Sequence, residues 1–321
     1  MSSRRKKAQI KKDTHRLFLG VDGGGTKTHI VLVNDAGEVM CEGHAGPSNP
    51  LRVGVETAAS NILKAVNDAA DCGGLARSDI AAAVFGLAGV RRADLRQRVR
   101  ESFLHLLRVD SVKVITDAEI ALYAVTEGKP GVVVIAGTGS ICYGRNKNGK
   151  TAIAGGWGPL AGDEGGAAGI ARDALHAVAK ASDGRAAATE LSKSAAEYFR
   201  ASGPENLIVA IYSPQVDNLR IAGFARSVVA AALDGDKIAL EIIRNGGIEL
   251  GTAACAVIAQ LGMQKEKVPI GCVGSIFQAG KILTGPMIDT LRESAPRAFL
   301  TVPRIPPAHA AALLALQNGG L

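Results

Sequence analysis

The chain has 321 residues, 47% hydrophobic and 21% charged, and a net charge of +7. Because a single core stops growing at about 250 to 300 residues, this length predicts two domains with a cleft between them, and the composition excludes a wholly disordered chain. The charge does not indicate a nucleic-acid-binding surface, because +6 of it falls within residues 1–16, which we expect to form a disordered basic tail.

Neither export nor membrane insertion is indicated. The tail lacks the apolar core of about 7 to 15 residues that a signal peptide has, and no charge-free, strongly apolar run reaches about 18 residues. The five cysteines are an odd number and contain no CxxC pair. We therefore expect a cytoplasmic protein with reduced thiols, and neither a membrane nor a nucleic acid as partner.

Residues 17–33 contain two β-rich runs around a polar turn with three glycines, Gly23–Gly25, followed by Thr26 and Lys27. Glycines leave no Cβ between the backbone N–H groups and an anion, and Lys27 adds a positive charge, so the turn is a candidate polyphosphate site. A Walker loop or a dinucleotide fingerprint would lead into a helix, whereas residues 29–33 are typical of a returning strand. A plain glycine-rich hairpin is the alternative.

Strands and helices are predicted to alternate after this hairpin. Residues 38–41 favour a third strand, 54–70 a helix, 80–87 a buried strand and 94–107 an amphipathic helix. This order indicates a parallel sheet covered by helices. Asn49 lies in a loop between prolines, where its amide could grip a ligand or serve only as a turn residue.

Asp117 follows a short predicted strand, 112–116, and precedes a predicted helix, 118–125. Open α/β sheets bind ligands at the carboxyl ends of their strands, which makes this carboxylate a candidate ligand-binding group. An Asp here could equally cap the helix and stabilise it by about 1 kcal/mol. The residue pattern leaves both roles open.

Residues 131–149 repeat the design of the first hairpin: a strand, a glycine and threonine turn, a returning strand and a closing turn. Thr138 precedes Gly149 by 11 residues, as Thr26 precedes Gly37 by 11. The match predicts an internal duplication, with two hairpins that could hold one polyphosphate between two domains.

A glycine-rich loop over residues 155–166 contains the only tryptophan, Trp157. Its glycine density indicates a ligand-facing loop, although Asp163 and Glu164 would suit the start of the predicted helix over 167–180 without any ligand.

The chain is then predicted to be helical to about residue 262, with segments such as 221–233 and 242–260. A strand over 268–273 leads to a tight turn at Gly274 and Ser275.

Seven ordered segments resemble the N-acetylglucosamine kinases of the BadF/BadG/BcrA/BcrD ATPase family, within the actin, hsp70 and sugar kinase superfamily. They are GVDGGGTKT (20–28), SN (48–49), ITDAEIA (115–121), IAGTGSICYG (135–144), GGWGPLAGDEG (155–165), IAGFAR (221–226) and CVGS (272–275). The resemblance implies an α/β fold of two duplicated ribonuclease-H-like, actin-like ATPase domains. They would comprise residues 17–130 and 131–321, and the last helix could pack back on the first domain.

The resemblance also implies ATP and Mg²⁺ as cofactors and an amino sugar as substrate. The ATP site would comprise Gly24, Gly25, Thr26, Lys27, Thr138, Gly139, Ala222, Gly274 and Ser275. The sugar site would comprise Asn49, Asp117, Gly156, Trp157, Gly158 and Asp163. Asp22 would hold the metal through water, and Asp117 would be the catalytic base that accepts the proton of the 6-hydroxyl.

The expected reaction is therefore ATP-dependent phosphorylation of the 6-hydroxyl of N-acetylglucosamine, and we expect a homodimer. A neutral, half-apolar acetamido group would suit a glycine turn beside an indole better than the ammonium of glucosamine would. The sequence departs from the family pattern at Pro50 and Leu51, where the better-known members have His and Trp. Glucosamine or another hexosamine is the alternative substrate.

Another function also occurs in this family. An ATPase that activates a dehydratase or reductase would need an iron–sulfur cluster, and Cys142 beside the second hairpin is a candidate ligand without an obvious partner. A sugar-responsive repressor of the superfamily would need an N-terminal helix-turn-helix, for which a 16-residue tail is too short.

Overall fold

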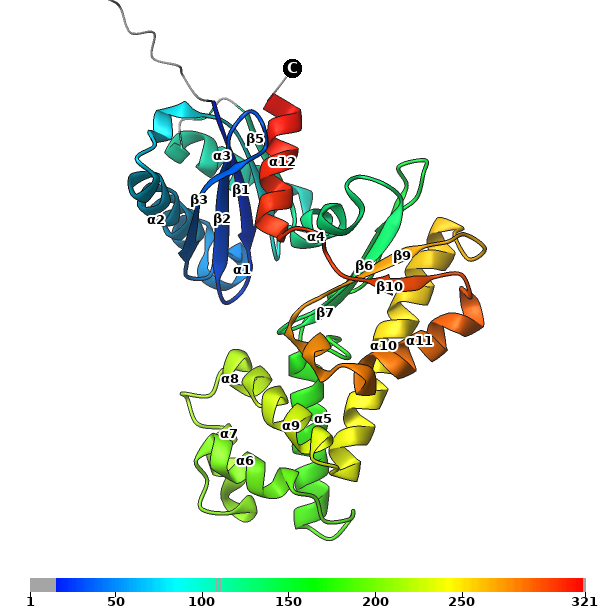
Figure 1. The fold of residues 1–321 in the computed structure, drawn as a ribbon. Coiled ribbons are helices and arrows are strands. Elements are labelled where there is room, and N and C mark those ends of the chain that lie inside the picture. The colour runs from blue at the N-terminus through cyan, green and yellow to red at the C-terminus, as the bar shows by residue number, and fades with distance from the viewer. Residues whose placement is uncertain (1–15, 108, 110, 320–321) are drawn as a thin grey trace, which may run out of the picture.

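The computed structural model describes residues 16–107, 109 and 111–319 (Figure 1). The predicted basic tail lies outside the described residues, apart from Arg16. Two five-stranded sheets organise the described chain.

The first sheet has the strand order β3-β2-β1-β4-β5. Its strands are β1 (Leu17–Gly23), β2 (Thr28–Val33), β3 (Val39–Ala45), β4 (Ile80–Leu87) and β5 (Ser111–Thr116). The first three are antiparallel, and β4 and β5 run parallel to β1. The third strand is longer than the predicted 38–41, because its pairing with β2 continues to Ala45.

Helices cover both faces of this sheet. One face packs against α2 (Val55–Gly73) and α3 (Ala93–Leu107), and the short α1 (Pro50–Val53) precedes α2. The other face packs against α4 (Asp117–Thr126) and the last helix, α12 (Pro307–Gly319), which returns to the first sheet from the far end of the chain (Figure 1). The predicted division at residue 130 stays a prediction.

The second sheet repeats this topology in the order β8-β7-β6-β9-β10. Its strands are β6 (Gly131–Ala136), β7 (Ser140–Arg145), β8 (Thr151–Gly155), β9 (Pro269–Val273) and β10 (Phe299–Thr301). In each sheet an antiparallel three-stranded meander is followed by two parallel strands. This confirms the predicted α/β class and the duplicated ribonuclease-H-like fold.

The closing turns of the two hairpins confirm the duplication at atomic level. Gly37 donates its N–H to Asn34 C=O at 2.9 Å, and Gly149 donates to Asn146 C=O at 3.0 Å. Both glycines have φ of +78°. Each asparagine Oδ1 also accepts two backbone N–H groups within its turn.

Between β8 and β9 the chain is helical, as predicted. The helices are α5 (Ala167–Ser182), α6 (Leu191–Phe199), α7 (Leu207–Ile211), α8 (Asn218–Gly223), α9 (Ala225–Leu233) and α10 (Lys237–Leu261), and α11 (Lys281–Ser294) follows β9. The single segment predicted over 221–233 is wrong, because the chain breaks at Phe224 between α8 and α9. By length and composition α10 could cross a membrane, but half of its apolar window is buried within the protein.

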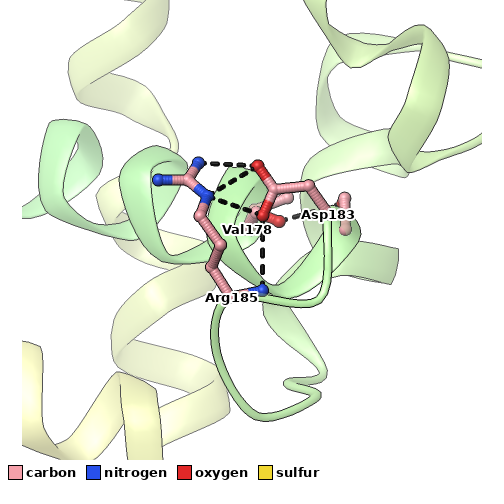
Figure 2. Close-up of polar contacts among 4 residues, drawn as sticks. Val178, Asp183 and Arg185 are labelled. Atoms are coloured by element: carbon pink, nitrogen blue, oxygen red, sulfur yellow. Dashed lines mark hydrogen bonds and ion pairs between the residues drawn. The ribbon is translucent and has the colours of Figure 1, made fainter.

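The far end of α5 is closed by a local ion pair. Arg185 Nε and Nη2 donate to the Asp183 carboxylate at 2.8 and 2.6 Å. Figure 2 shows this pair near Val178, whose C=O accepts a hydrogen bond from the Ser182 hydroxyl. Both charged side chains are exposed, so the pair contributes little to stability. This end of the helix is opposite the end that meets the second glycine turn (Figure 1).

Helix α4 links the two sheets. Its Ile120 packs in the core on the first sheet, whereas Ala121 and Val125 pack against Val133 of the second sheet. The start of α4, where Asp117 lies, is therefore fixed relative to both sheets.

Candidate active site

The first glycine turn is anchored to the loop that carries Asn49. Gly24 C=O accepts hydrogen bonds from the N–H groups of Ser48 and Asn49, each at 3.1 Å. Gly24 N–H donates to Lys27 C=O at 3.0 Å across the turn. The buried hydroxyls of Thr28 and Ser48 are joined at 2.7 Å beneath it. Hydrogen bonds therefore hold the first glycine turn and the loop that carries Asn49 together.

The second glycine turn is tied to the start of α5. Gly137 and Thr138 accept hydrogen bonds through their C=O groups from Ala167 and Ala168, both at 2.9 Å. The Thr138 side chain is exposed, as is its counterpart Thr26 in the first turn. The backbone of each turn is thus held by hydrogen bonds, and its threonine side chain is exposed to solvent.

The Asp163 side chain packs against the second glycine turn and accepts a hydrogen bond beside it. Its Oδ1 accepts the Ser140 N–H at 3.1 Å, and a Cβ at Gly139 would overlap the same oxygen. The residue is only 7% exposed, and burial raises the pKa of its carboxyl. The structure therefore places Asp163 against the turn, and its predicted contact with sugar stays a prediction.

Asp22 and Asp117 place two half-buried carboxylates at the carboxyl ends of parallel strands of the first sheet: Asp22 of β1 pairs with Gly86 of β4, and Gly86 pairs with Ile115 of β5, two residues before Asp117. Burial and the neighbouring Asp117 raise the pKa of Asp22 to about 7, against the opposing charge of Lys27. Burial likewise raises the pKa of Asp117 to about 6, against the hydrogen bond that its Oδ1 accepts from Ala118 N–H at 2.9 Å. Raised pKa values of this kind are typical of acid–base and metal sites.

Asp117 is not the cap of α4, so that alternative is wrong. Thr116 is the N-cap, and its Oγ1 accepts the Glu119 N–H at 3.2 Å. Glu119 in turn accepts the Thr116 N–H at 2.8 Å, which completes a capping box. Because other residues cap the helix, the Asp117 carboxylate is not required as a cap and is available for binding a ligand or accepting a proton.

The Asp22 carboxylate fits a magnesium ion. Magnesium takes oxygen ligands and is often held by one or two carboxylates together with substrate phosphates. A cation at Asp22 would also offset the repulsion that raises its pKa. Within residues 16–107, 109 and 111–319, no three acidic, histidine or cysteine side chains cluster as a metal site. The protein residues alone therefore form only part of such a site.

On the expected sugar side, Asn49 and Trp157 come from different halves of the chain. Asn49 Oδ1 caps α1 by accepting the Leu51 N–H at 2.9 Å, and its amide packs so closely on Gly89 that a Cβ there would overlap it. Trp157 is 70% exposed. The Arg91 guanidinium lies 5.7 Å from the centroid of its ring. This contact joins the two halves of the molecule.

Gly156 and Gly158 shape the loop around Trp157. Their φ angles are +73° and +82°, which other residues rarely adopt. The turn therefore presents an exposed indole between two positions where side chains are disfavoured.

The three residues that are expected to contact the nucleoside differ in their exposure to solvent. Gly274 faces the Ala136 carbonyl at the end of β6 so closely that no side chain would fit, and Ser275 follows it on the surface. Both lie beside the second glycine turn. Ala222 is 4% exposed within α8, so its methyl group points into the protein. All three nucleoside contacts stay predictions.

Sequence reasoning missed Arg52. Its Nη1 donates to Gly25 C=O at 3.0 Å, and its Nη2 lies 4.0 Å from Asp217 Oδ2. Asp217 caps α8 by accepting the Arg220 N–H at 2.7 Å. Arg52 thus connects the first glycine turn to α8, and no local pattern in the sequence indicates so distant a partner.

One cavity lies apart from these residues. It measures about 710 Å³ between α6, α7 and α8, and its lining includes Arg200, Asn206 and Arg220. It contains none of the carboxylates described above, so it does not locate the candidate active site.

Cys142 is buried in the core of the second half, and burial raises the pKa of its thiol well above the usual range. A thiol held neutral in an apolar core is a poor metal ligand, which disfavours the iron–sulfur alternative.

Comparison with known proteins gives consistent matches. The sequence model of the BadF/BadG/BcrA/BcrD ATPase family matches residues 19–315. An N-acetylmuramic acid/N-acetylglucosamine kinase from Clostridium acetobutylicum is 33% identical over 82% of this chain and 86% of its own. An N-acetyl-D-glucosamine kinase from Dictyostelium discoideum is 31% identical over 94% and 98%. A glucosamine kinase from Vibrio cholerae is 28% identical over 73% and 77%.

A solved structure has the same architecture. It is a candidate N-acetylglucosamine kinase from Chromobacterium violaceum, with a TM-score of 0.78 and 25% identity. The match covers 94% of this chain and 99% of that one.

Proposed function

Because the chain belongs to the BadF/BadG/BcrA/BcrD ATPase family, we propose that it is an ATP-dependent amino-sugar kinase that phosphorylates the 6-hydroxyl of N-acetylglucosamine. The observation that carries this proposal is that Asp22 and Asp117 lie at the carboxyl ends of parallel strands of the first sheet, in a chain with two matched glycine turns. The amino-sugar kinases among the relatives support the substrate class.

Asp117 is proposed as the general base. A base is most effective when its pKa lies near the working pH, and a pKa of about 6 leaves this carboxylate mostly ionised at neutral pH. It would accept the proton of the 6-hydroxyl as the oxygen attacks the γ-phosphorus, the bond from that phosphorus to the β,γ-bridging oxygen breaks, and ADP leaves. Phosphoryl transfer otherwise depends on positioning and on neutralising charge.

The two turns are proposed to position the ATP phosphates. Thr26 and Lys27 would contact them from the first half and Thr138 from the second. Gly24, Gly25 and Gly139 have no side chain that would keep the anion away from the backbone of the turns. Asp22 would hold Mg²⁺, which when bound supplies positive charge to the phosphates.

Asn49, Trp157 and the glycines beside the indole are proposed to face the sugar. The exposed indole offers an apolar surface to the acetamido methyl group and ring face. We keep a cytoplasmic location and a homodimer as predictions.

The test is an ADP-release assay with purified protein, ATP and Mg²⁺ and a panel of N-acetylglucosamine, glucosamine, N-acetylmannosamine and glucose. We expect the highest kcat/KM for N-acetylglucosamine. A higher value for glucosamine would overturn the assignment of the sugar while leaving an amino-sugar kinase. If neither an amino sugar nor glucose stimulates ADP release, the kinase proposal is wrong.

A further inference from the structure

The middle of the Trp157 loop (residues 155–166) is not held by burial of its own side chains. Trp157 is 70% exposed and Leu160 is 99% exposed, so apolar packing contributes little to the position of this part of the loop. Asp163, near its end, has a φ of +64°, in the left-handed region that side chains other than glycine rarely adopt. A backbone of this kind keeps one conformation only when surrounding groups hold it.

Arg172 of α5 is the side chain that holds the middle of the loop. Its Nη1 donates to Pro159 C=O, and its Nη2 donates to Gly162 C=O at 3.3 Å. No other side chain in the described part of the chain donates a hydrogen bond to residues 157–162. A Cβ at Gly162 would lie 3.1 Å from Trp157 Cβ, so Gly162 packs directly against the tryptophan. Arg172 therefore supports the backbone against which Trp157 packs.

The helix that carries Arg172 is itself fixed to the second glycine turn. Ala167 and Ala168, in the first turn of α5, donate their N–H groups to carbonyls of that glycine turn, and Arg172 follows in the next turn of the helix. Its side chain is half-buried, and among the described residues no carboxylate lies within ion-pair distance of it. The planar fork of a guanidinium can bind two carbonyls at once. Arg172 thus sets the position of the Trp157 loop relative to the turn proposed to bind phosphate.

We infer that Arg172 is a positioning residue that holds the Trp157 loop in the conformation that binds the sugar. This inference rests on the proposed function and adds to it a residue that lies outside the expected sugar and ATP contacts. When only a fraction of the molecules has the binding conformation, the measured affinity falls in proportion to that fraction. Loss of the Arg172 contacts should therefore weaken sugar binding, while nucleotide affinity and kcat at saturating sugar change little.

Trp157 is the only tryptophan of the chain, so its fluorescence reports on this loop directly. The experiment measures the fluorescence anisotropy of the free protein in the wild type, Arg172→Gln, Arg172→Lys and Lys180→Gln. Isothermal titration gives the dissociation constants of N-acetylglucosamine and of a nonhydrolysable ATP analogue, and steady-state assays give kcat.

We expect Arg172→Gln to lower the anisotropy, to weaken N-acetylglucosamine binding about tenfold and to leave binding of the ATP analogue within about twofold of the wild type. Arg172→Lys should recover part of the sugar affinity, because an ammonium can still donate to one of the two carbonyls. Lys180→Gln removes an exposed positive charge from the far end of the same helix and should behave as the wild type.

An unchanged sugar affinity or an unchanged anisotropy in Arg172→Gln would overturn the inference while the kinase proposal survives. An equal loss of sugar and nucleotide affinity would overturn it too, because it would show a general loss of structure. If the wild type binds the sugar without phosphorylating any amino sugar, the proposed function is wrong and the inference survives. Circular dichroism and the melting temperature verify that each variant is folded, and Arg172→Lys is the variant compared if Arg172→Gln is not.

Discussion

At the scale of single residues, the ionisation of Asp22 links function to stability. Its carboxyl pKa is raised from 3.8 to about 7 in the folded protein, so folding is favoured when the group is protonated, and this advantage is lost as the pH rises through about 7. We predict that Asp22→Asn stabilises the metal-free protein by on the order of 1 to 4 kcal/mol at pH 8 and by much less at pH 5.

Urea unfolding at the two pH values, with and without Mg²⁺, measures this effect. Magnesium should stabilise the wild type at pH 8 and leave Asp22→Asn unaffected. A gain in the free energy of unfolding that is the same at pH 5 and pH 8 would show that the charge of Asp22 is not its cause.

The threonines of the two turns give a second prediction at this scale. Because both hydroxyls are exposed on equivalent turns, Thr26→Val and Thr138→Val should each weaken ATP binding about 3- to 10-fold, the effect of one lost hydrogen bond. Isothermal titration with a nonhydrolysable ATP analogue measures it, and Thr151→Val at the exposed first residue of strand β8 is the matched control. Unchanged affinity in both turn variants would contradict a shared phosphate site.

At the scale of elements, Arg52 connects the first glycine turn to the N-cap of α8. An exposed ion pair at 4.0 Å contributes little by itself, so the main effect should come from the hydrogen bond to Gly25. We predict that Arg52→Gln raises the KM for ATP about 3- to 10-fold and that Asp217→Asn adds little to it.

A double-mutant cycle tests this link, with Arg292→Gln in the exposed pair with Asp289 as control. A KM unchanged by Arg52→Gln, or one equally raised by Arg292→Gln, would exclude a specific role for Arg52 at the turn.

Local sequence patterns predicted most of the fold. Amphipathic helices and strands have periodic apolar residues, and turn residues mark hairpins and strand ends. Strand β8 was missed, although the repeat itself indicates it: β3 follows the first closing turn as β8 follows the second. The break at Phe224 was missed because the alanine-rich sequence that follows it favours helix.

The residues of the candidate site could be predicted where they belong to a sequence motif. They could not be predicted where segments that are distant in the sequence come into contact. Neither the Arg52–Asp217 link nor the Arg91–Trp157 contact leaves a local signal, since the partners are far apart in sequence. The capping role of Thr116 was readable from the Glu three residues later.

At the scale of the whole molecule, two copies of one topology are joined by α4 and by the return of α12 to the first sheet (Figure 1). Because the proposed ligands come from both halves, binding should draw them together and exclude water. We predict a smaller radius of gyration by small-angle scattering with N-acetylglucosamine and a nonhydrolysable ATP analogue than with either alone. Identical scattering in all states would contradict closure.

We propose that Asp117 activates the 6-hydroxyl of an amino sugar for attack on ATP. The most direct test is ³¹P NMR of the product formed from ATP and N-acetylglucosamine by the wild type and by Asp117→Asn, with Asp94→Asn as a folded control. We predict the 6-phosphate ester with the wild type and with Asp94→Asn, and a kcat lowered about 10²- to 10⁴-fold in Asp117→Asn. A phosphate ester at another hydroxyl, or an Asp117→Asn variant with wild-type kcat, would contradict this role of Asp117.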